Sequence, residues 1–289
     1  QFGTIPCRCS GLVNANIAID PMKLLILCGG QGTRLREETE YKPKPMVEIG
    51  GKPILWHIMK LYSFYGIREF VLALGYKGDV IRDYFLNFHY YGSDFTVDLK
   101  NPGKVEIHGG REEQDWKVTL VETGKDSMTG YRVKACEPYL PDSEFMLTYG
   151  DAVSDVNIKS LLDYHHSQKT IGTVTGVFPP SRFGDLHVEG DRVVRFKEKR
   201  LDTTDQSPIN GGFFVFKREF LSAIPSDPTC DLERVPLEGL ASSGQLSVYR
   251  HPGFWQCMDT FRDYRLLNDM WDSKPAWKVW DSKNSTVVK

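Results

Sequence analysis

The stretch at residues 22–46 combines a glycine-rich turn with basic residues. An apolar segment at residues 24–27 runs directly into Gly29-Gly30-Gln31-Gly32-Thr33-Arg34, and Lys42 and Lys44 follow one loop later. Glycines let backbone N–H groups approach an anion without obstruction by side chains, while Arg and Lys add charge-assisted donors. Together these residues predict a binding site for a polyphosphate.

Two better-known glycine motifs do not fit this turn. Read as a dinucleotide fingerprint, the segment fails at its third glycine, because Leu35 stands there. A Walker loop would require Gly-Lys-Ser/Thr after four further residues, and that sequence does not follow. The pattern therefore indicates a different class of phosphate site.

Two aspartates are candidate ligands for a metal ion. Asp151 follows an apolar segment at residues 145–148, after Tyr149-Gly150, and Asp259 follows the apolar and aromatic segment at residues 253–258. Mg2+ prefers oxygen ligands, usually one or two carboxylates together with substrate phosphates, and this pair meets that need. Either aspartate could instead cap a helix, and Asp259 directly precedes a segment that we expect to be helical.

Other kinds of catalytic site lack support in the sequence. We find no motif for a Ser-His-Asp or Cys-His arrangement, and five histidines show no zinc-ligand spacing: His57, His108, His165, His166 and His251. Six cysteines without CxxC pairs are typical of reduced, mostly buried thiols in a cytoplasmic protein. Cys7-Arg8-Cys9 is the one pair whose spacing would suit a metal or a redox function.

Length and composition narrow the function class. A chain of 289 residues with 40% hydrophobic content can bury one large core or two small ones, and a net charge of −2 argues against a nucleic-acid or membrane-surface protein. No apolar run approaches about 18 residues, so no transmembrane helix is expected. Residues 1–21 lack the features of a signal peptide, and we interpret them as an extension or leader outside the catalytic part.

Alternating patterns predict an α/β architecture. Apolar runs predict strands at residues 24–28, 69–74, 118–121 and 145–148. Helical spacing predicts helices at residues 53–65, 157–166 and 260–271, and another helix for which Asp79 could be the cap. More strands are expected towards the C-terminus, at residues 170–177, 186–188, 193–197, 212–216 and 246–250. Such layers bind ligands at the carboxyl ends of their strands.

The glycine turn and the Pro-Lys loop resemble the signature of the sugar-nucleotide pyrophosphorylases, or sugar nucleotidyltransferases, whose pattern is GGxGTRL followed by a loop containing Pro-Lys. The resemblance runs from about residue 22 to residue 280. Further stretches resemble the glucose-1-phosphate cytidylyltransferase branch: residues 50–59 (GGKPILWHIM), 75–78 (GYKG), 148–151 (TYGD), 210–214 (NGGFF) and 251–256 (HPGFWQ).

This resemblance implies a Rossmann-like, three-layer nucleotidyltransferase fold with a mixed, mostly parallel central sheet and a strand-rich sugar-binding part. It implies one catalytic domain at residues 22–289, in which about 22–150 bind the nucleotide and about 151–289 bind the sugar. The implied reaction joins CTP and α-D-glucose 1-phosphate into CDP-glucose and pyrophosphate with Mg2+, and the product would feed deoxysugar synthesis for surface polysaccharide. A homo-oligomer, such as a hexamer, is implied as well.

The resemblance also assigns roles to single residues. Arg34 and Lys44 are implied as catalytic, with Lys44 favoured over Lys42, and Asp151 and Asp259 are implied as the Mg2+ ligands. The implied nucleotide contacts are Cys28, Gly29, Gly30, Gln31, Gly32, Thr33, Arg34, Ser127, Arg132 and Gly150. The implied sugar-phosphate contacts are Lys44, Glu198, Lys199, Asn210 and Gly211.

Several of these residues have plainer alternatives. Arg132 could be a solvated charge on a helix surface, and residues 210–213 could form a β-bulge. The chain also departs from the family pattern at Tyr131, where a second glycine is usual, and at Arg200, where proline is usual. Tyr tolerates positive φ less well than Gly, so the backbone path at residue 131 is open.

Two competing functions remain compatible with the sequence. Composition does not choose among nucleobases, so the same chemistry with UTP or dTTP is one alternative. The other is a regulatory subunit that binds nucleotide sugars without turnover. Retention of Arg34, Lys44, Asp151 and Asp259 argues against that subunit, because binding alone would not require all four.

Overall fold

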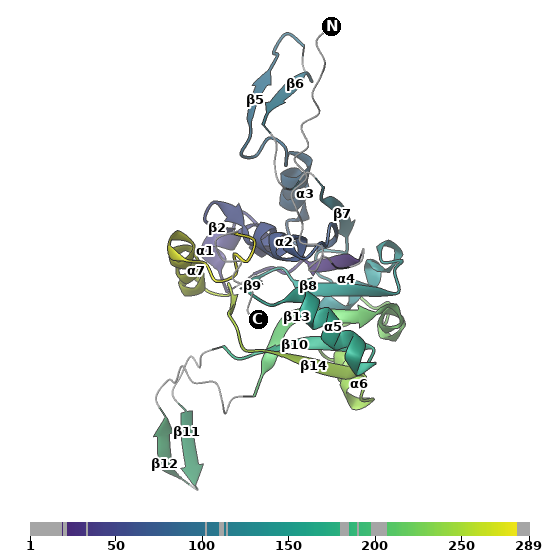
Figure 1. Ribbon diagram of the computed structural model, residues 1–289, viewed down its shortest axis with the longest axis vertical. Helices are drawn as coiled ribbons and strands as arrows, with labels where there is room; N and C mark the ends of the chain where they lie inside the picture. Colours follow the sequence, from purple (N-terminus) through teal and green to yellow (C-terminus); the bar gives the residue numbers. More distant parts are fainter. Residues whose placement is uncertain are drawn as a thin grey trace.

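The computed structural model describes residues 19, 22–32, 34–101, 103–109, 113, 115–179, 185–189, 191–197 and 207–281. Its centre is a seven-stranded sheet (Figure 1). The strands, in spatial order, are β14 (Leu246–His251), β10 (Gly172–Val177), β13 (Ile209–Lys217), β8 (Glu144–Tyr149), β1 (Lys23–Leu27), β4 (Glu69–Leu74) and β7 (Lys117–Glu122). β13 runs antiparallel to both of its neighbours, and the other pairs are parallel. The expected mixed, mostly parallel sheet is confirmed.

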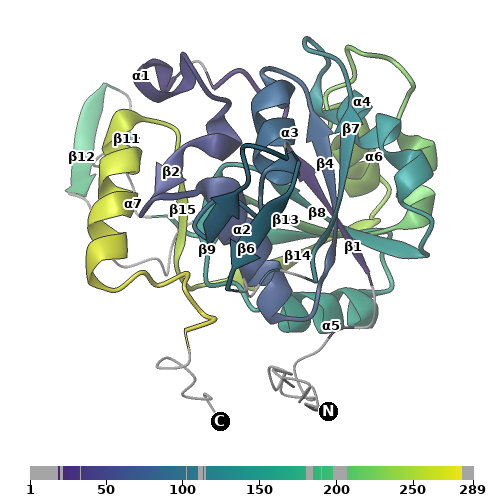
Figure 2. The same ribbon diagram turned by 90° about the horizontal axis from the view of Figure 1, so that it is seen from above.

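Alternate residues of β1 face two separate apolar cores. Leu24 and Ile26 belong to the core that includes residues of α2 and α5, whereas Leu25 and Leu27 belong to the core that includes residues of α4 and α6. The sheet therefore lies between two helical layers (Figure 2). The helices are α1 (Arg36–Thr39), α2 (Ile54–Phe64), α3 (Gly78–Leu86), α4 (Thr129–Ala135), α5 (Ile158–Gln168), α6 (Val235–Ser242) and α7 (Phe261–Ser273). Short 3-10 turns are η1 (Lys44–Met46), η2 (Glu137–Tyr139) and η3 (Arg218–Ala223).

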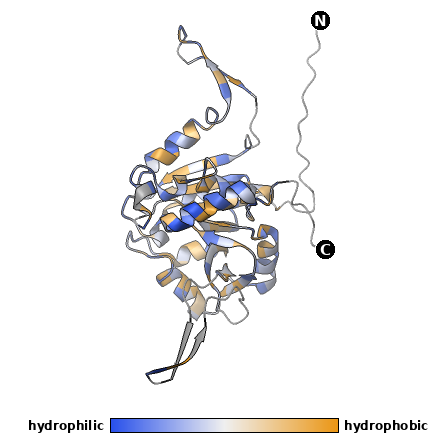
Figure 3. Cartoon of the chain, turned by 90° about the vertical axis from the view of Figure 1, so that its left-hand side faces the viewer, coloured by the Kyte–Doolittle hydropathy of each residue, from blue (hydrophilic) through white to orange (hydrophobic). Residues whose placement is uncertain are grey.

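Four two-stranded sheets surround this centre within the described residues. They pair β2 (Glu48–Ile49) with β3 (Lys52–Pro53), β5 (Asp94–Val97) with β6 (Val105–His108), β9 (Ala152–Ser154) with β15 (Trp255–Cys257), and β11 (Asp185–Glu189) with β12 (Arg192–Lys197). The hairpin β5–β6 stands away from the body and carries apolar residues along its length (Figures 1 and 3). Apolar periodicity in the sequence does not predict this hairpin.

The predicted elements agree with the structure to within a few residues, apart from one helix start. Asp79 does not cap α3, because the residue before the helix is Lys77, in the left-handed region at φ 50°, and no side chain caps the turn. Asn157 does cap α5, since its Oδ1 accepts the Ser160 N–H at 2.9 Å.

The seven-stranded sheet contains strands from both halves of the chain. β13 from the second half pairs with β8, and β8 pairs with β1 from the first half. Nucleotide-binding and sugar-binding parts would therefore share one continuous sheet. Among the described residues, no helix has the length and apolarity needed to cross a bilayer.

Candidate active site

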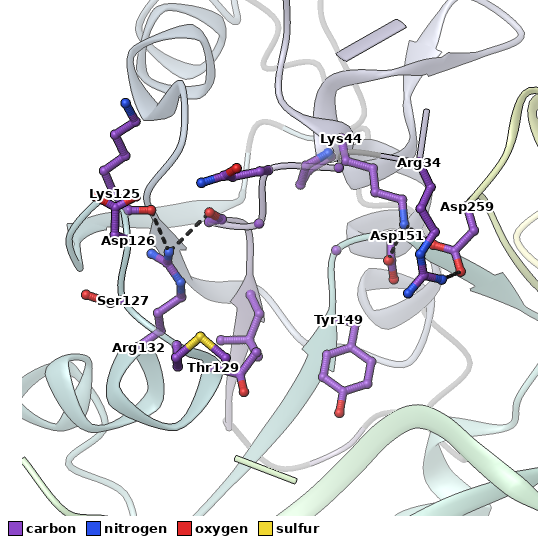
Figure 4. Close-up of a pocket in the computed structure, with 18 residues that line it drawn as sticks. Arg34, Lys44, Lys125, Asp126, Ser127, Thr129, Arg132, Tyr149, Asp151 and Asp259 are labelled. Atoms are coloured by element: carbon purple, nitrogen blue, oxygen red, sulfur yellow. Dashed lines mark hydrogen bonds and ion pairs between the residues drawn. The ribbon is translucent and has the colours of Figure 1, made fainter. Parts of the chain in front are cut away.

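A cavity of about 520 Å³ opens at the carboxyl ends of β1 and β8 (Figure 4). Arg34, Lys44, Asp151 and Asp259 form one end, and the segment 125–129 with Arg132 forms the other. Its walls are Leu27, Gly29, Gly30, Gln31, Gly32, Arg34, Lys44, Pro45, Lys125, Asp126, Ser127, Met128, Thr129, Arg132, Tyr149, Gly150, Asp151 and Asp259.

The glycine turn borders this cavity with open backbone. Gly32 has φ +62°, and a Cβ on it would lie 2.9 Å from Thr39 Cγ2, so a larger residue would be both strained and crowded. Within the described part of the chain, the backbone N–H groups of Gly30, Gln31 and Gly32 donate to no other group. They are thus available to an anion in the cavity. Thr33, also predicted to contact the nucleotide, lies outside the described residues.

Arg132 is a buried clamp beneath the turn. Its side chain, in a residue only 4% exposed, donates to the carbonyl oxygens of Leu74 (3.0 Å), Gly124 (2.8 Å), Gly29 (3.2 Å) and Lys125 (3.2 Å). It also donates to Thr123 Oγ1 at 2.7 Å. Burial lowers the Arg132 pKa from its ordinary value, although nearby anionic groups oppose this.

These contacts add a structural role for Arg132. The alternative of a solvated surface charge is wrong, because the residue is buried and both terminal nitrogens donate to protein oxygens, while the side chain also lines the cavity. The guanidinium also explains why glycine stands at two positions, since a Cβ on Gly29 or Gly75 would lie 2.2 or 2.3 Å from Arg132 Nη1. Arg132 therefore holds the glycine turn and the 124–125 backbone at a fixed separation.

Strand pairing between distant segments brings the two aspartates together. β15 pairs antiparallel with β9, with Cys257 opposite Ala152, and the Met258 N–H donates to the Asp151 carbonyl at 2.9 Å. Asp151 and Asp259 consequently flank one point at the cavity edge. The Lys44 ammonium lies at that point, 2.6 Å from Asp151 Oδ2 and 2.5 Å from Asp259 Oδ1.

The pKa values of Lys44 and Asp259 reflect partial burial and the opposite charges beside them. Burial would lower the pKa of Lys44, but Asp151 and Asp259 outweigh it, so the pKa is raised and the ammonium stays charged. Burial would raise the pKa of Asp259, but Lys44 and Arg34 outweigh it, so the pKa is lowered and the carboxylate stays ionised. Arg34, whose side chain is 77% exposed, reaches Asp259 Oδ2 at 3.2 Å.

Two alternatives left open by the sequence are decided here. Lys42 lies outside the cavity and pairs with Glu48 at 3.3 Å, so the structure places Lys44 and not Lys42 in the site. Asp259 is not a helix cap: Thr260 Oγ1 accepts the Asp263 N–H at 3.3 Å, and Asp263 accepts the Thr260 N–H in return. The Asp259 carboxylate is free of the helix and faces the cations.

The same carboxylates suit a divalent cation. Both direct an oxygen at a single positive charge, the Lys44 ammonium, so their convergence on a cation is built into the fold. The cavity is lined by cationic side chains (Arg34, Lys44, Lys125 and Arg132) and by nearly as many carboxylates (Asp126, Asp151 and Asp259). Little net positive charge is therefore left to neutralise a triphosphate. No group of three or more His, Cys, Asp or Glu side chains converges in the described residues. Two carboxylates completed by substrate phosphates remain sufficient for Mg2+.

The opposite end of the cavity is formed by the segment before α4. Ser127 lines it together with Lys125, Asp126 and Thr129, as the prediction for Ser127 requires. Tyr131 lies inside α4 without positive φ, so tyrosine at this position needs no change of backbone path. Gly130 is the tight position, because a Cβ there would lie 2.9 Å from the Cys230 carbonyl oxygen.

The predicted sugar contacts lie beside this cavity. Asn210 and Gly211 do not line it, but Asn210 Nδ2 donates to the hydroxyl of Tyr149, a wall residue, at 3.1 Å. The alternative of a β-bulge at residues 210–213 is present as well, since the pairing of β13 with β10 shifts register there. Glu198 and Lys199 lie outside the described residues, as do Arg200 and the pair Cys7 and Cys9.

Cys28 does not face the cavity, contrary to the prediction. It is fully buried in a core cluster, and burial raises the pKa of its thiol well above the ordinary range. The described cysteines are all free, and three of the four are buried: Cys28, Cys136 and Cys230, with Cys257 half-buried. The expectation of mostly buried thiols is confirmed for these four.

Sequence comparison now adds to this geometry. The family model for nucleotidyl transferases matches residues 23–256, which include the glycine turn, Lys44 and Asp151. The chain belongs to the nucleotidyl transferase family. Glucose-1-phosphate cytidylyltransferase of Salmonella typhi is 49% identical to it over 262 residues, covering 90% of this chain and all of that protein.

Solved structures give the same fold. HddC from Yersinia pseudotuberculosis superposes with a TM-score of 0.63 at 23% identity, covering 86% of this chain and 99% of that one. UDP-glucose pyrophosphorylase complexed with UDP-glucose gives a TM-score of 0.62 at 15% identity, covering 88% and 99%. At these identities the likeness concerns the architecture alone.

Sequence reasoning missed several wall residues of this nucleotidyl transferase. Lys125, Asp126, Thr129 and Tyr149 line the cavity but were assigned no role. Three of them flank Ser127 within two residues, which was an available signal. Tyr149 immediately precedes Gly150-Asp151, and on a strand that ends at the site its position was also a signal.

Proposed function

We propose that this protein transfers a cytidylyl group from CTP to α-D-glucose 1-phosphate, giving CDP-glucose and pyrophosphate. The structural observation that carries the proposal is the Lys44 ammonium held between Asp151 and Asp259 beside the open amides of the glycine turn. The choice of CTP and glucose 1-phosphate rests on the 49% identity to the Salmonella typhi protein of that name.

The reaction needs alignment and charge neutralisation and does not need a nucleophile from the protein. An oxygen of the sugar phosphate forms a bond to the α-phosphorus while the bond from that phosphorus to the β-phosphate oxygen breaks, and pyrophosphate leaves with the electron pair. The attacking phosphate is already an anion near neutral pH, so no general base is required. Such a step is accelerated mainly by positioning and by placed positive charge.

The residues of the site meet these two needs. The free N–H groups of Gly30, Gln31 and Gly32 would hold the nucleotide phosphates. Lys44 would bridge the α-phosphate and the incoming sugar phosphate, and the exposed planar fork of Arg34 would bind the leaving β- and γ-phosphates. Arg132 would keep the glycine turn in place from below.

Asp151 and Asp259 are the residues that would hold Mg2+. Bound there, the ion would neutralise phosphate oxygens and draw electron density from the α-phosphorus. Because the two carboxylates already direct an oxygen at a common positive charge, they need little rearrangement to accept the ion.

Pyrophosphate release with glucose 1-phosphate, Mg2+ and each of CTP, UTP, dTTP and GTP tests the proposal. Fastest release with CTP is expected. Faster release with UTP or dTTP would assign a different nucleobase, and binding of nucleotide without release from any of the four would identify a non-catalytic subunit.

We also expect the protein to be a homo-oligomer, following the family resemblance described above. Sedimentation or light scattering of the purified protein measures this directly. A monomer at assay concentration would contradict the expectation without affecting the proposed reaction.

A further inference from the structure

Glu233 lies outside the cavity, yet its carboxylate contacts two wall residues at once. Oε1 accepts the hydroxyl of Tyr149, and Oε2 accepts the hydroxyl of Thr129 at 2.8 Å. Thr129 opens the helix beside the 125–128 segment, whereas Tyr149 ends β8 next to Asp151. One side chain therefore joins opposite parts of the site.

The hydrogen bonds around Glu233 have a defined direction. The Leu232 N–H donates to Thr129 Oγ1 at 2.9 Å, and Asn210 Nδ2 donates to Tyr149 Oη at 3.1 Å. Both hydroxyl oxygens thus accept one hydrogen bond, and both hydroxyl hydrogens point to Glu233. This pattern requires acceptor oxygens at residue 233, which an ionised carboxylate supplies.

This direction also orients Asn210. Its Oδ1 accepts the Gly212 N–H at 2.9 Å, so the amide cannot flip without losing a bond. One hydrogen of Nδ2 goes to Tyr149, and the second has no acceptor within the described part of the chain. Asn210 therefore presents one free N–H donor beside the cavity.

The surroundings hold this arrangement in place. The ring of Tyr149 lies against Gly212, where a Cβ would approach Tyr149 Cδ2 to 2.5 Å, and Gly212 itself has φ +78°. The loop that carries Glu233 is tied to the 128–130 backbone, since Met128 N–H donates to the Pro228 carbonyl at 2.8 Å and Gly130 N–H donates to the Cys230 carbonyl at 3.0 Å.

We propose that Glu233 is a positioning residue for the sugar phosphate: through Tyr149 it orients Asn210 so that a free N–H donor meets a hydroxyl of the hexose. The inference rests on the proposed function, because it requires a hexose phosphate as substrate. Glu233 would not touch the substrate itself.

The charge state of Glu233 sets the assay conditions. Burial of the carboxyl and the neighbouring Asp231 raise the pKa of Glu233, while the hydrogen bonds from Tyr149 and Thr129 lower it by less. Because a raised pKa favours the neutral form at lower pH, the assay is run above neutrality, at about pH 8.

Initial rates of pyrophosphate release test the proposal with Glu233→Ala, Tyr149→Phe and their combination. Each single change should raise the KM for the hexose 1-phosphate about tenfold, the value of one oriented hydrogen bond, while kcat and the KM for CTP change less than threefold. The double variant should equal the single ones, because both cut the same chain of hydrogen bonds. Glu233→Gln should recover part of the loss, since its amide oxygen can still accept the Tyr149 hydroxyl.

Glu238→Ala, on the nearby helix α6, is the matched control and should leave all constants unchanged. A hexose phosphate KM within twofold of wild type for Glu233→Ala would overturn the proposal. Equal rises in the KM for the hexose 1-phosphate and the KM for CTP would also overturn it. So would a double variant whose hexose phosphate KM rises by the product of the two single effects. Assays of the wild-type protein with several hexose 1-phosphates separate the proposed function from the positioning role of Glu233. If another hexose phosphate is preferred, the proposed substrate is wrong, and the variants are then compared on the preferred one.

Discussion

Replacing Lys44 by alanine removes the one charge on which both aspartates converge. In the wild type the ammonium is only 12% exposed and lies 2.6 and 2.5 Å from the two carboxylates. In the variant, Arg34 is the remaining cation beside Asp259, and it is largely exposed. We expect turnover to suffer much more than nucleotide binding, because the glycine turn and Arg34 are left intact.

The size of the effect follows from the position of the charge. At about 4 Å and an effective dielectric constant of about 20, one unit-charge interaction is worth about 4 kcal/mol, or about 10³ in rate. The triphosphate is anionic before as well as during the reaction. Loss of Lys44 therefore lowers kcat only by the part of its interaction that is stronger in the transition state than with the bound substrate. A loss of about 10²–10³ in kcat is therefore expected, as for other placed donors.

Steady-state pyrophosphate release and CTP binding by calorimetry measure these two effects separately. Lys42→Ala is the matched control, because Lys42 is a neighbouring lysine that pairs with Glu48 outside the cavity. It should keep kcat within twofold of wild type. Near-normal kcat for Lys44→Ala together with a damaged Lys42→Ala would refute the assignment of the loop.

Three further changes test other parts of the structure. Asp259→Asn should lower kcat at least tenfold at limiting Mg2+, with partial recovery at high Mg2+ or with Mn2+; unchanged kinetics would remove Asp259 from the proposed metal site, since it is not a cap. Arg132→Met should cost about 3–5 kcal/mol in urea unfolding, because the hydrogen bonds of a buried guanidinium are lost and several buried carbonyls are left without donors; a loss below about 1 kcal/mol would contradict the clamp. Burial lowers the pKa values of His57 and His165 to about 4 from 6.5, so the unfolded chain binds more protons between these values. Stability should therefore fall as pH drops from about 6.5 towards 4, which urea midpoints at about pH 7.5 and 5 would show, and equal midpoints would exclude it.

Some of the site was accessible to sequence reasoning because it depends on local patterns. The glycine turn follows the first buried strand and needs positive φ at Gly32. That requirement depends on the glycine itself and on its neighbours in sequence. Lys44 was preferred over Lys42 by the family pattern, and the structure agrees. Strand and helix positions were predictable for the same reason, since the side-chain period of each element lies in consecutive residues.

Other features could not be read from spacing. Arg132 looked like a nucleotide contact or a surface charge, yet its partners are backbone carbonyls from three separate segments. Asp259 before a helix looked like a possible cap until Thr260 took that role. Cys28, next to the glycine turn in sequence, points into the core because alternate residues of a strand face opposite sides.

The sequence by itself determined the main strands and helices, the glycine turn and the family of this protein, because apolar periodicity and contiguous motifs are properties of neighbouring residues. Only the tertiary structure decided which distant side chains meet. The pairing of β9 with β15 joins Asp151 and Asp259 on Lys44, and the loop before α6 brings Glu233 to Tyr149 and Thr129. Such contacts depend on sheet register and loop packing between segments more than eighty residues apart, and no local pattern records them.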